Sequence, residues 1–199
     1  MSRPESKPPT PKQAGTRTGE APDRQMPSLT KRSSVRSWVH AFHPSTYDFP
    51  SGTIMQPRLN FFTASPEAMK AMAGLEHHVA RSGIDKPLVE LVRLRASQIN
   101  GCAFCIDKHA ADARQGGEGE RRLASLSAWR ETPFFSDRER AALEWTESIT
   151  LVAETHVPDS VWERIQPHFT PAALVDLTLL INSINAWNRF AIAFRKLPA

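Results

Sequence analysis

Cysteine is scarce in this chain of 199 residues, which contains only Cys102 and Cys105. Two cysteines cannot build the several disulfides that hold small secreted domains together. Long apolar runs are also absent. No stretch approaches the roughly 20 residues needed to cross a bilayer, and the first thirty residues contain no apolar core of a signal peptide. We therefore expect a protein without a membrane segment, in a reducing compartment such as the cytoplasm.

Positive charge is in excess overall, but the excess lies outside the part with a globular composition. The formal net charge is +4, and residues 1–54 hold eight Lys and Arg against four Asp and Glu. Residues 55–199 hold 17 residues of each sign. Nucleic-acid binding by a folded domain requires clustered cations on a structured face. We therefore do not expect a nucleic acid as a partner.

The chain divides by composition into an N-terminal extension and one domain. Residues 1 to about 36 are rich in Pro, Ser, Thr and basic residues and have few aliphatics, a composition that cannot bury enough surface to fold alone. We predict that residues 1–54 form a disordered or loosely docked extension, and Met55 could equally be the true start. Residues 55–199 are long enough for a domain with a single core.

Helical periodicity runs through this domain, and the alternating pattern of a strand does not occur in it. Helices are predicted over residues 66–81, 86–100, 102–115 and 118–127, from a capping box of Ser136 and Glu139, from residue 159, and over 171–195. The last of these helices is apolar on nearly every face, which requires burial within the domain or against another subunit. We predict an all-α, compact bundle of about six to seven helices that self-associates.

The two cysteines form one Cys-x-x-Cys unit directly after Asn100-Gly101, which is a strong turn signal. Residues three and four apart share a helix face, so Cys102, Cys105 and His109 would line one stripe. Such units at helix starts lower the thiol pKa, because the helix dipole and the neighbouring thiol stabilise the thiolate. A histidine four residues beyond a cysteine can take its proton. The spacing therefore indicates thiol chemistry.

Glu90 is the candidate carboxylate that would orient His109, as in other sites that combine a nucleophile, a base and an orienting group. A continuous helix would hold Glu90 about 18 Å from the first cysteine, at 1.5 Å per residue. If the predicted turn folds the chain into a helix hairpin, Glu90 returns to the level of His109. Alternatively, Glu90 only pairs with Arg93 or Arg95 on its own helix.

Two further interpretations of the motif stay open. The cysteines with His109 and Glu90 could hold a tetrahedral zinc ion, although structural zinc sites usually have two knuckles of ligands and no second knuckle follows here. The cysteines could also be buried and unreactive, because free cysteine is a common core residue. We expect no bound metal and no cofactor, since a dithiol itself carries both electrons of a redox reaction.

Residues 90–114, with the sequence ELVRLRASQINGCAFCIDKHAADAR, resemble the core motif of the alkyl hydroperoxidase D family, also called the carboxymuconolactone decarboxylase family. Thiol-active members have Glu, eleven residues, Cys, two residues, Cys, three residues and His, and this spacing is found here. The similarity extends from about Met55 to Phe194. It implies an alkyl hydroperoxidase D-like helical fold that assembles into dimers, trimers or hexamers.

The resemblance also implies roles for the four residues of the motif. Cys105 would be the peroxidatic thiol and Cys102 the resolving thiol, while His109 and Glu90 would form a proton relay. Phe104 departs from the pattern, because better-studied peroxidases of the family have a histidine between the cysteines.

We predict a thiol-dependent peroxidase that reduces an alkyl hydroperoxide and is recycled by an external dithiol reductant. The alternatives are a dithiol-disulfide oxidoreductase or redox sensor with little peroxidase turnover, and a zinc-stabilised helical interaction module.

Overall fold

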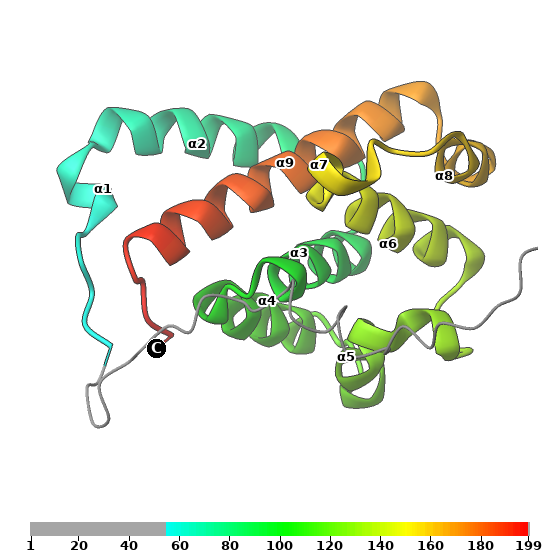
Figure 1. Cartoon of the computed structure of the whole chain (residues 1–199), viewed down its shortest axis with the longest axis horizontal. Coiled ribbons are helices and arrows are strands. Elements are labelled where there is room, and N and C mark those ends of the chain that lie inside the picture. The colour runs from blue at the N-terminus through cyan, green and yellow to red at the C-terminus, as the bar shows by residue number, and fades with distance from the viewer. Residues whose placement is uncertain (1–54, 199) are drawn as a thin grey trace, which may run out of the picture. The chain divides into compact units, whose positions relative to one another are not determined.

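The computed structural model of the protein describes residues 55–198 (Figure 1), so the extension predicted over residues 1–54 lies outside the described part. Within that part all regular structure is helical, which confirms the all-α prediction. The elements are α1 (Phe61–Ala64), α2 (Pro66–Val79), α3 (Lys86–Asn100), α4 (Ala103–Gln115), α5 (Glu120–Ser125), the 3-10 helix η2 (Leu126–Glu131), α6 (Asp137–Thr150), α7 (Val152–Thr155), α8 (Asp159–Ile165), the 3-10 helix η3 (Gln166–His168) and α9 (Pro171–Ala193). Since α1 and α7 have only four residues each, seven longer α-helices form the bundle within residues 55–198.

Local capping accounts for where several helices begin. At α6 the hydroxyl of Ser136 accepts a hydrogen bond from the Glu139 amide at 3.3 Å, and the Glu139 carboxylate accepts one from the Ser136 amide at 2.7 Å. These reciprocal bonds satisfy amides that have no partner inside the helix. The predicted capping box is therefore confirmed. The segment predicted as one helix over 118–127 is instead divided into α5 and η2, with a kink at Ala128.

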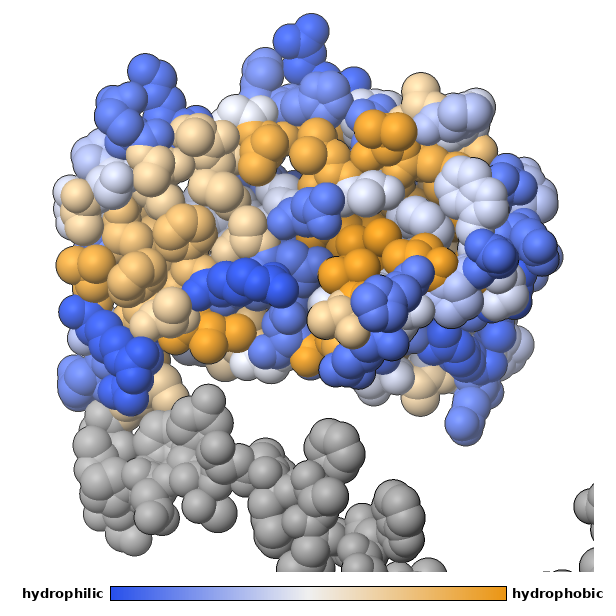
Figure 2. Space-filling view, turned by 45° about the horizontal axis from the view of Figure 1, so that its top comes forward, coloured by the Kyte–Doolittle hydropathy of each residue, from blue (hydrophilic) through white to orange (hydrophobic). Residues whose placement is uncertain are grey.

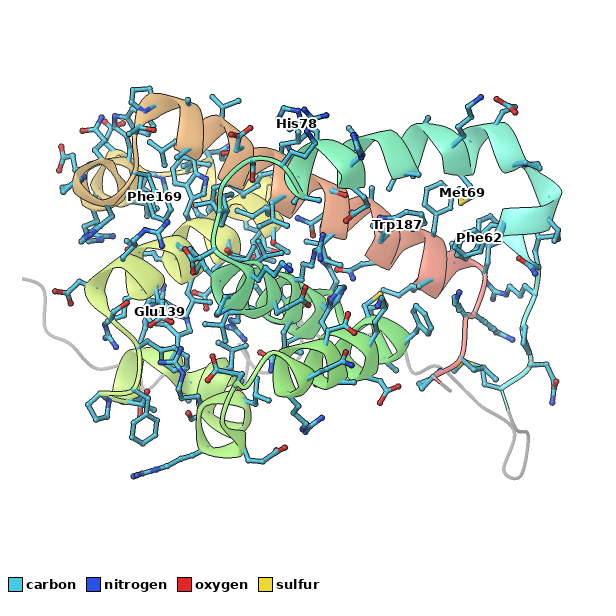
Figure 3. All side chains as sticks on the ribbon, turned by 180° about the vertical axis from the view of Figure 1, so that it is seen from behind. Phe62, Met69, His78, Glu139, Phe169 and Trp187 are labelled. Atoms are coloured by element: carbon cyan, nitrogen blue, oxygen red, sulfur yellow. A yellow bond between two sulfur atoms is a disulfide. The ribbon has the colours of Figure 1, made fainter. Side chains whose placement is uncertain are left out.

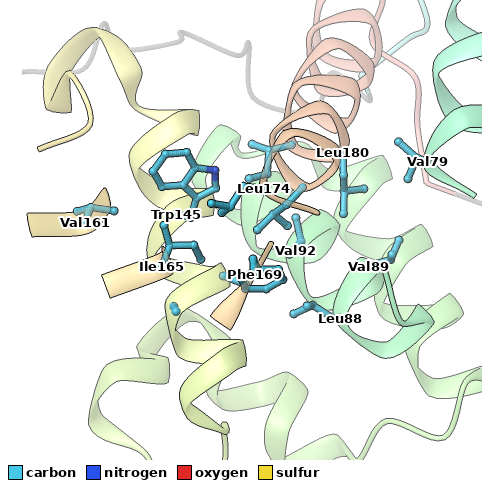
Figure 4. Packing of buried hydrophobic residues seen from close by; sticks show 14 residues of the cluster. Val79, Leu88, Val89, Val92, Trp145, Val161, Ile165, Phe169, Leu174 and Leu180 are labelled. Carbon is cyan, nitrogen blue, oxygen red and sulfur yellow. The ribbon is translucent and has the colours of Figure 1, made fainter. Parts of the chain in front are cut away.

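Helix α3 is the centre of the bundle, where it packs against α4, α6 and α9. Seven of its residues are buried, among them Leu88 and Val92 on the side of α9 and Leu91 on the side of η2. Figure 4 shows Leu88, Val89 and Val92 within the largest cluster of buried apolar residues in the described part of the chain. Full burial of such a side chain stabilises the fold by about 1.5–3 kcal/mol. A helix enclosed in this way can hold polar side chains away from bulk water.

Helix α9 is buried on one side and exposed on another. Leu177, Leu180 and Ile181 have no exposed area, whereas Val175 is 69% exposed and Ile192 is 46% exposed. Apolar residues are visible on the face shown in Figure 2. An open groove of about 630 Å³ lies beside the first half of α9, lined mainly by Trp145, Trp162, Phe169, Leu174, Val175 and Leu179.

No single helix in the described part of the chain has the length and apolar composition to cross a bilayer. The bent pair Asp159–His168 and Pro171–Ala193 is long and apolar enough only when its two helices are taken together.

Candidate active site

The turn between α3 and α4 brings the parts of the motif together. Gly101 has a left-handed conformation with φ of 68°, which a residue with a Cβ adopts only at a cost. The amide of Gly101 donates to the Gln98 carbonyl at 3.3 Å, and the amide of Cys102 donates to the Ser97 carbonyl at 3.0 Å. Helix α4 then packs against α3. The hairpin predicted from Asn100-Gly101 is therefore confirmed.

Cys102 and Cys105 form a disulfide bond in the structure, with their Cα atoms 5.3 Å apart. Cys102 is the N-cap of α4, and its Sγ accepts a hydrogen bond from the Cys105 amide at 3.3 Å. Both sulfurs thus lie at the positive end of a helix dipole, which favours a thiolate when the bond is reduced. The two residues are only 1% and 3% exposed, so protein covers the disulfide.

His109 and Glu90 form the pair that the predicted hairpin requires. Nδ1 of His109 lies 2.8 Å from Oε2 of Glu90, and the two side chains are 8% and 16% exposed. His109 follows Cys105 by one helical turn on the same face of α4. Its other ring nitrogen, Nε2, is the one left for a thiol. The hairpin therefore brings all four predicted site residues together, and the role of each stays a prediction.

Glu90 is shared between His109 and a neighbouring cation. Its second oxygen, Oε1, accepts a hydrogen bond from Nη1 of Arg93 at 3.0 Å. The pairing with Arg93, which was the alternative interpretation of Glu90, is therefore present together with the contact to His109. Arg95 is instead bonded to Glu147 of α6 at 2.8 Å.

Glu76 of α2 is a neighbour of the site that sequence patterns did not identify. Its Oε2 lies 2.5 Å from Nη2 of Arg93. Its Oε1 accepts hydrogen bonds from the Ser183 hydroxyl and, at 3.0 Å, from the Trp187 indole. Figure 3 labels Trp187 on α9, which packs against α2. No local pattern could reveal these contacts, because 107 and 111 residues separate the partners.

Asparagine amides join the end of α3 to α9 beside the turn. Nδ2 of Asn100 donates to Oδ1 of Asn185 at 2.7 Å and to Oδ1 of Asn188 at 2.8 Å. Nδ2 of Asn188 donates to the Ser97 hydroxyl at 3.0 Å. Buried amides are costly unless they are bonded, so these contacts hold the turn in register with α9. Asn100, Asn185 and Asn188 therefore have a structural role, which is to join the end of α3 to α9.

Phe104 helps to cover the disulfide. It packs with Ala191 of α9 against Cys102 and Cys105. Nζ of Lys196 lies 4.5 Å from the centre of the Phe104 ring, which is a cation–π distance. The residue between the cysteines therefore contributes packing and carries no proton.

A metal-binding arrangement is also present among the described residues. Ligand atoms of Glu90, His109 and Asp112 lie within 4.8 Å of one another. However, Arg93 already binds Glu90, and Lys108 binds Asp112 at 2.8 Å. The zinc site considered from the sequence needs both thiolates, and in this structure the sulfurs are bonded to each other.

A cavity of about 540 Å³ lies beside Glu90. Glu90, Arg93 and Asp112 contribute to its wall together with apolar residues that include Val79 and Val89. Neither cysteine is among the lining residues. Of the four predicted site residues, only Glu90 therefore contributes to the wall of this cavity.

Comparison with known proteins places the chain in a family. The model of the carboxymuconolactone decarboxylase family matches residues 66–148. The uncharacterized protein YdfG of Bacillus subtilis (strain 168) is 46% identical over 139 residues, which is 70% of this chain and 95% of that protein.

Solved structures give the same result for the fold. A protein of unknown function from Agrobacterium tumefaciens, whose suggested identity is the antioxidant defence protein AhpD, is 42% identical with a TM-score of 0.71, covering 72% of this chain and 99% of that one. The debrominase Bmp8 is 16% identical with a TM-score of 0.61, covering 69% and 74%, and shares the fold. The chain therefore belongs to the carboxymuconolactone decarboxylase family and has an alkyl hydroperoxidase D-like fold.

Proposed function

We propose that the protein is a thiol-dependent peroxidase that reduces alkyl hydroperoxides. The observation that carries the proposal is the hydrogen-bonded His109–Glu90 pair one helical turn beyond a Cys-x-x-Cys unit at a helix start. This arrangement supplies a nucleophile, a base and an orienting carboxylate on two adjacent helices. The Agrobacterium protein, with its suggested role in antioxidant defence, supports the same chemistry.

The reaction starts with the thiol of Cys105. His109 accepts the thiol proton while Glu90 stabilises the resulting imidazolium. The thiolate attacks one peroxide oxygen and the O–O bond breaks. Sulfur is oxidised to a sulfenic acid, and the leaving alkoxide takes the proton from His109 and departs as an alcohol.

Recycling involves the second cysteine. The thiol of Cys102 attacks the sulfenic sulfur of Cys105, so the disulfide forms and water leaves. An external dithiol then reduces this disulfide by two exchange steps and becomes a disulfide itself. The pair carries both electrons, so we expect neither a metal nor another cofactor.

The cover over the disulfide favours the second candidate function. A dithiol-disulfide oxidoreductase or redox sensor with little peroxidase turnover would be consistent with Phe104 at the position where a proton-carrying residue would assist turnover. It would also be consistent with sulfurs that are 1% and 3% exposed. A zinc-stabilised interaction module is the non-enzymatic alternative, which metal analysis of the purified, reduced protein would detect.

Self-association as a dimer, trimer or hexamer is part of the proposal. It is supported by the open apolar groove beside α9 and by the 44% exposure of Trp162 at its edge. We place the protein in a reducing compartment, the cytoplasm, where a dithiol reductant is supplied continuously. Residues 1–54 are proposed to be an accessory extension to the domain formed by residues 55–199.

The decisive experiment follows peroxide and thiols together. Limiting alkyl hydroperoxide added to the reduced protein should consume both thiols and yield one intramolecular disulfide. In Cys102→Ser a sulfenic acid should accumulate on Cys105, detected by mass spectrometry after trapping. A sulfenic acid on Cys102 in Cys105→Ser, with none on Cys105, would reverse the two roles. Peroxide that leaves both thiols intact, while an added disulfide oxidises them, would replace the peroxidase by the oxidoreductase.

A further inference from the structure

Two charged residues outside the motif are connected to the relay through one continuous set of hydrogen bonds. Arg93 bridges two carboxylates, with Nη1 on Oε1 of Glu90 at 3.0 Å and Nη2 on Oε2 of Glu76 at 2.5 Å. Glu76 is fixed in turn by the Ser183 hydroxyl and the Trp187 indole of α9. Helices α2, α3, α4 and α9 thus all contribute to the position of one carboxylate.

The bonds divide the oxygens of Glu90 between two partners. Arg93 holds Oε1, which leaves Oε2 for Nδ1 of His109 at 2.8 Å. A guanidinium presents its N–H groups in a rigid planar fork, so its position on Glu76 limits how Glu90 can rotate. The side chain of Arg93 is only 17% exposed and that of Glu90 16%, so water has little access to compete for these bonds.

The charged groups around His109 leave one negative charge in excess. Glu76, Glu90 and Asp112, whose Oδ2 lies 3.8 Å from Nδ1 of His109, carry three negative charges. Arg93 and Lys108 carry two positive charges. A proton passed from the thiol to His109 would supply the third positive charge, and balanced charge is favoured because burial of uncompensated charge is costly.

We propose that Arg93, held by Glu76, is a positioning residue for the thiol chemistry. It fixes the orientation and the charge of Glu90, so that Glu90 keeps the Nδ1–H of His109 and leaves Nε2 for Cys105. The inference rests on the proposed function, because it assigns the support of the same relay. Arg93 touches neither the sulfurs nor the imidazole in the contacts described above.

A purely structural ion pair is the competing explanation, and the chain contains a matched control for it. Arg95 lies two residues further along α3, is 16% exposed, and bonds to Glu147 of α6, which is 15% exposed. The two arginines thus match in burial, at 17% and 16% exposed, and each joins α3 to a second helix, although Glu76 is 31% exposed against 15% for Glu147. The Arg95–Glu147 pair has no bond to Glu90 or His109.

The test compares Arg93→Met, Arg93→Lys, Arg95→Met and Glu90→Gln in the full-length protein. Three quantities are measured: the melting temperature, the pH dependence of iodoacetamide alkylation of the reduced protein, and the downfield proton NMR signal of the His109 Nδ1–H. We expect Arg93→Met to slow alkylation at pH 7 about tenfold, the effect of losing one hydrogen bond to a charged group, and to lose the downfield signal. Arg93→Lys should restore part of the alkylation rate and part of the NMR signal, because lysine keeps the positive charge but lacks the planar guanidinium group.

Arg95→Met should lower the melting temperature but keep the alkylation profile and the NMR signal. An Arg93→Met variant that loses stability and leaves both of these unchanged would overturn the inference. If Glu90→Gln also leaves alkylation unchanged, then the relay itself is wrong, and the peroxidase proposal depends on the peroxide experiment alone. If alkylation is slower in Glu90→Gln but unchanged in Arg93→Met, only the role of Arg93 is refuted.

Discussion

His109→Ala and Glu90→Gln test whether the relay activates the thiol of Cys105. Nδ1 and Oε2 are 2.8 Å apart, and neither side chain is more than 16% exposed, so the bond is shielded from water. A hydrogen bond to a charged group contributes about 1.5–3 kcal/mol. Tenfold in rate corresponds to about 1.4 kcal/mol, so each variant should slow thiol alkylation at pH 7 by about 10- to 100-fold.

The double variant distinguishes one relay from two independent effects. Since Glu90 acts only through His109, removing both should cost little more than removing His109 alone. The assay is the pseudo-first-order rate of iodoacetamide labelling of the reduced protein, resolved by mass spectrometry for Cys102 and Cys105.

A second histidine–carboxylate pair provides the control for these variants. His78 and Asp176 are 2.9 Å apart in a contact between α2 and α9 that includes no residue of the hairpin. His78→Ala should leave labelling unchanged. If the labelling rate of the double variant falls by the product of the two single-variant reductions, a single relay is refuted. An unchanged rate in His109→Ala would remove the relay and leave the dithiol chemistry standing.

Three further predictions concern stability and the extension. Burial raises the pKa of Glu147, but its hydrogen bonds to Arg130, Trp129 and Arg95 outweigh this effect and hold the pKa below the ordinary 4.5. The stability that the Glu147 carboxylate contributes is therefore fully present above pH 4.5 and is lost as the pH falls through the lower folded pKa. Glu147→Gln should thus lower the melting temperature at pH 7, and the difference from the unsubstituted protein should shrink as the pH falls below 4.5. Gly101→Ala should lower the free energy of unfolding, measured with urea, by about 1–2 kcal/mol, because the φ of 68° disfavours a residue with a Cβ. Gly74→Ala should raise the free energy of unfolding by about 0.5–1 kcal/mol, because Gly74 lies inside α2 and an added Cβ would meet no other atom. Deletion of residues 1–54 should leave the helix content, measured by circular dichroism, and the thiol reactivity unchanged. If size-exclusion chromatography shows that the truncated protein no longer forms the oligomer, then residues 1–54 are not merely accessory to the domain.

The hairpin was predictable because its determinants are local. Asn100-Gly101 is a turn signal in any context, and the left-handed φ of Gly101 is the conformation that this signal indicates. The capping box of Ser136 is local in the same way. Once the turn is placed, the 3.6-residue repeat of two antiparallel helices brings Glu90 beside His109 without further information.

The support of the relay could not be predicted, because it depends on tertiary packing. On the sequence, Glu76 is one acidic residue of an amphipathic helix, and Arg93 is one of two arginines near Glu90. The i,i+3 spacing places Arg93, and not Arg95, on the face of Glu90, but the contact of Arg93 with Glu76 of α2 depends on how the helices pack. The partners of Glu76 on α9 are more than 100 residues away, and no helical repeat encodes that distance.

The short spacing of the two cysteines has a consequence for chain entropy. The bond closes a loop with a sequence separation of only three residues. In the loop-closure model such a link restricts the unfolded chain by only about 2 kcal/mol, against about 4.7 kcal/mol for a loop of 100 residues. The core around α3, rather than the cross-link, therefore carries the stability of the fold. We therefore expect reduction of the disulfide to leave the rest of the bundle folded.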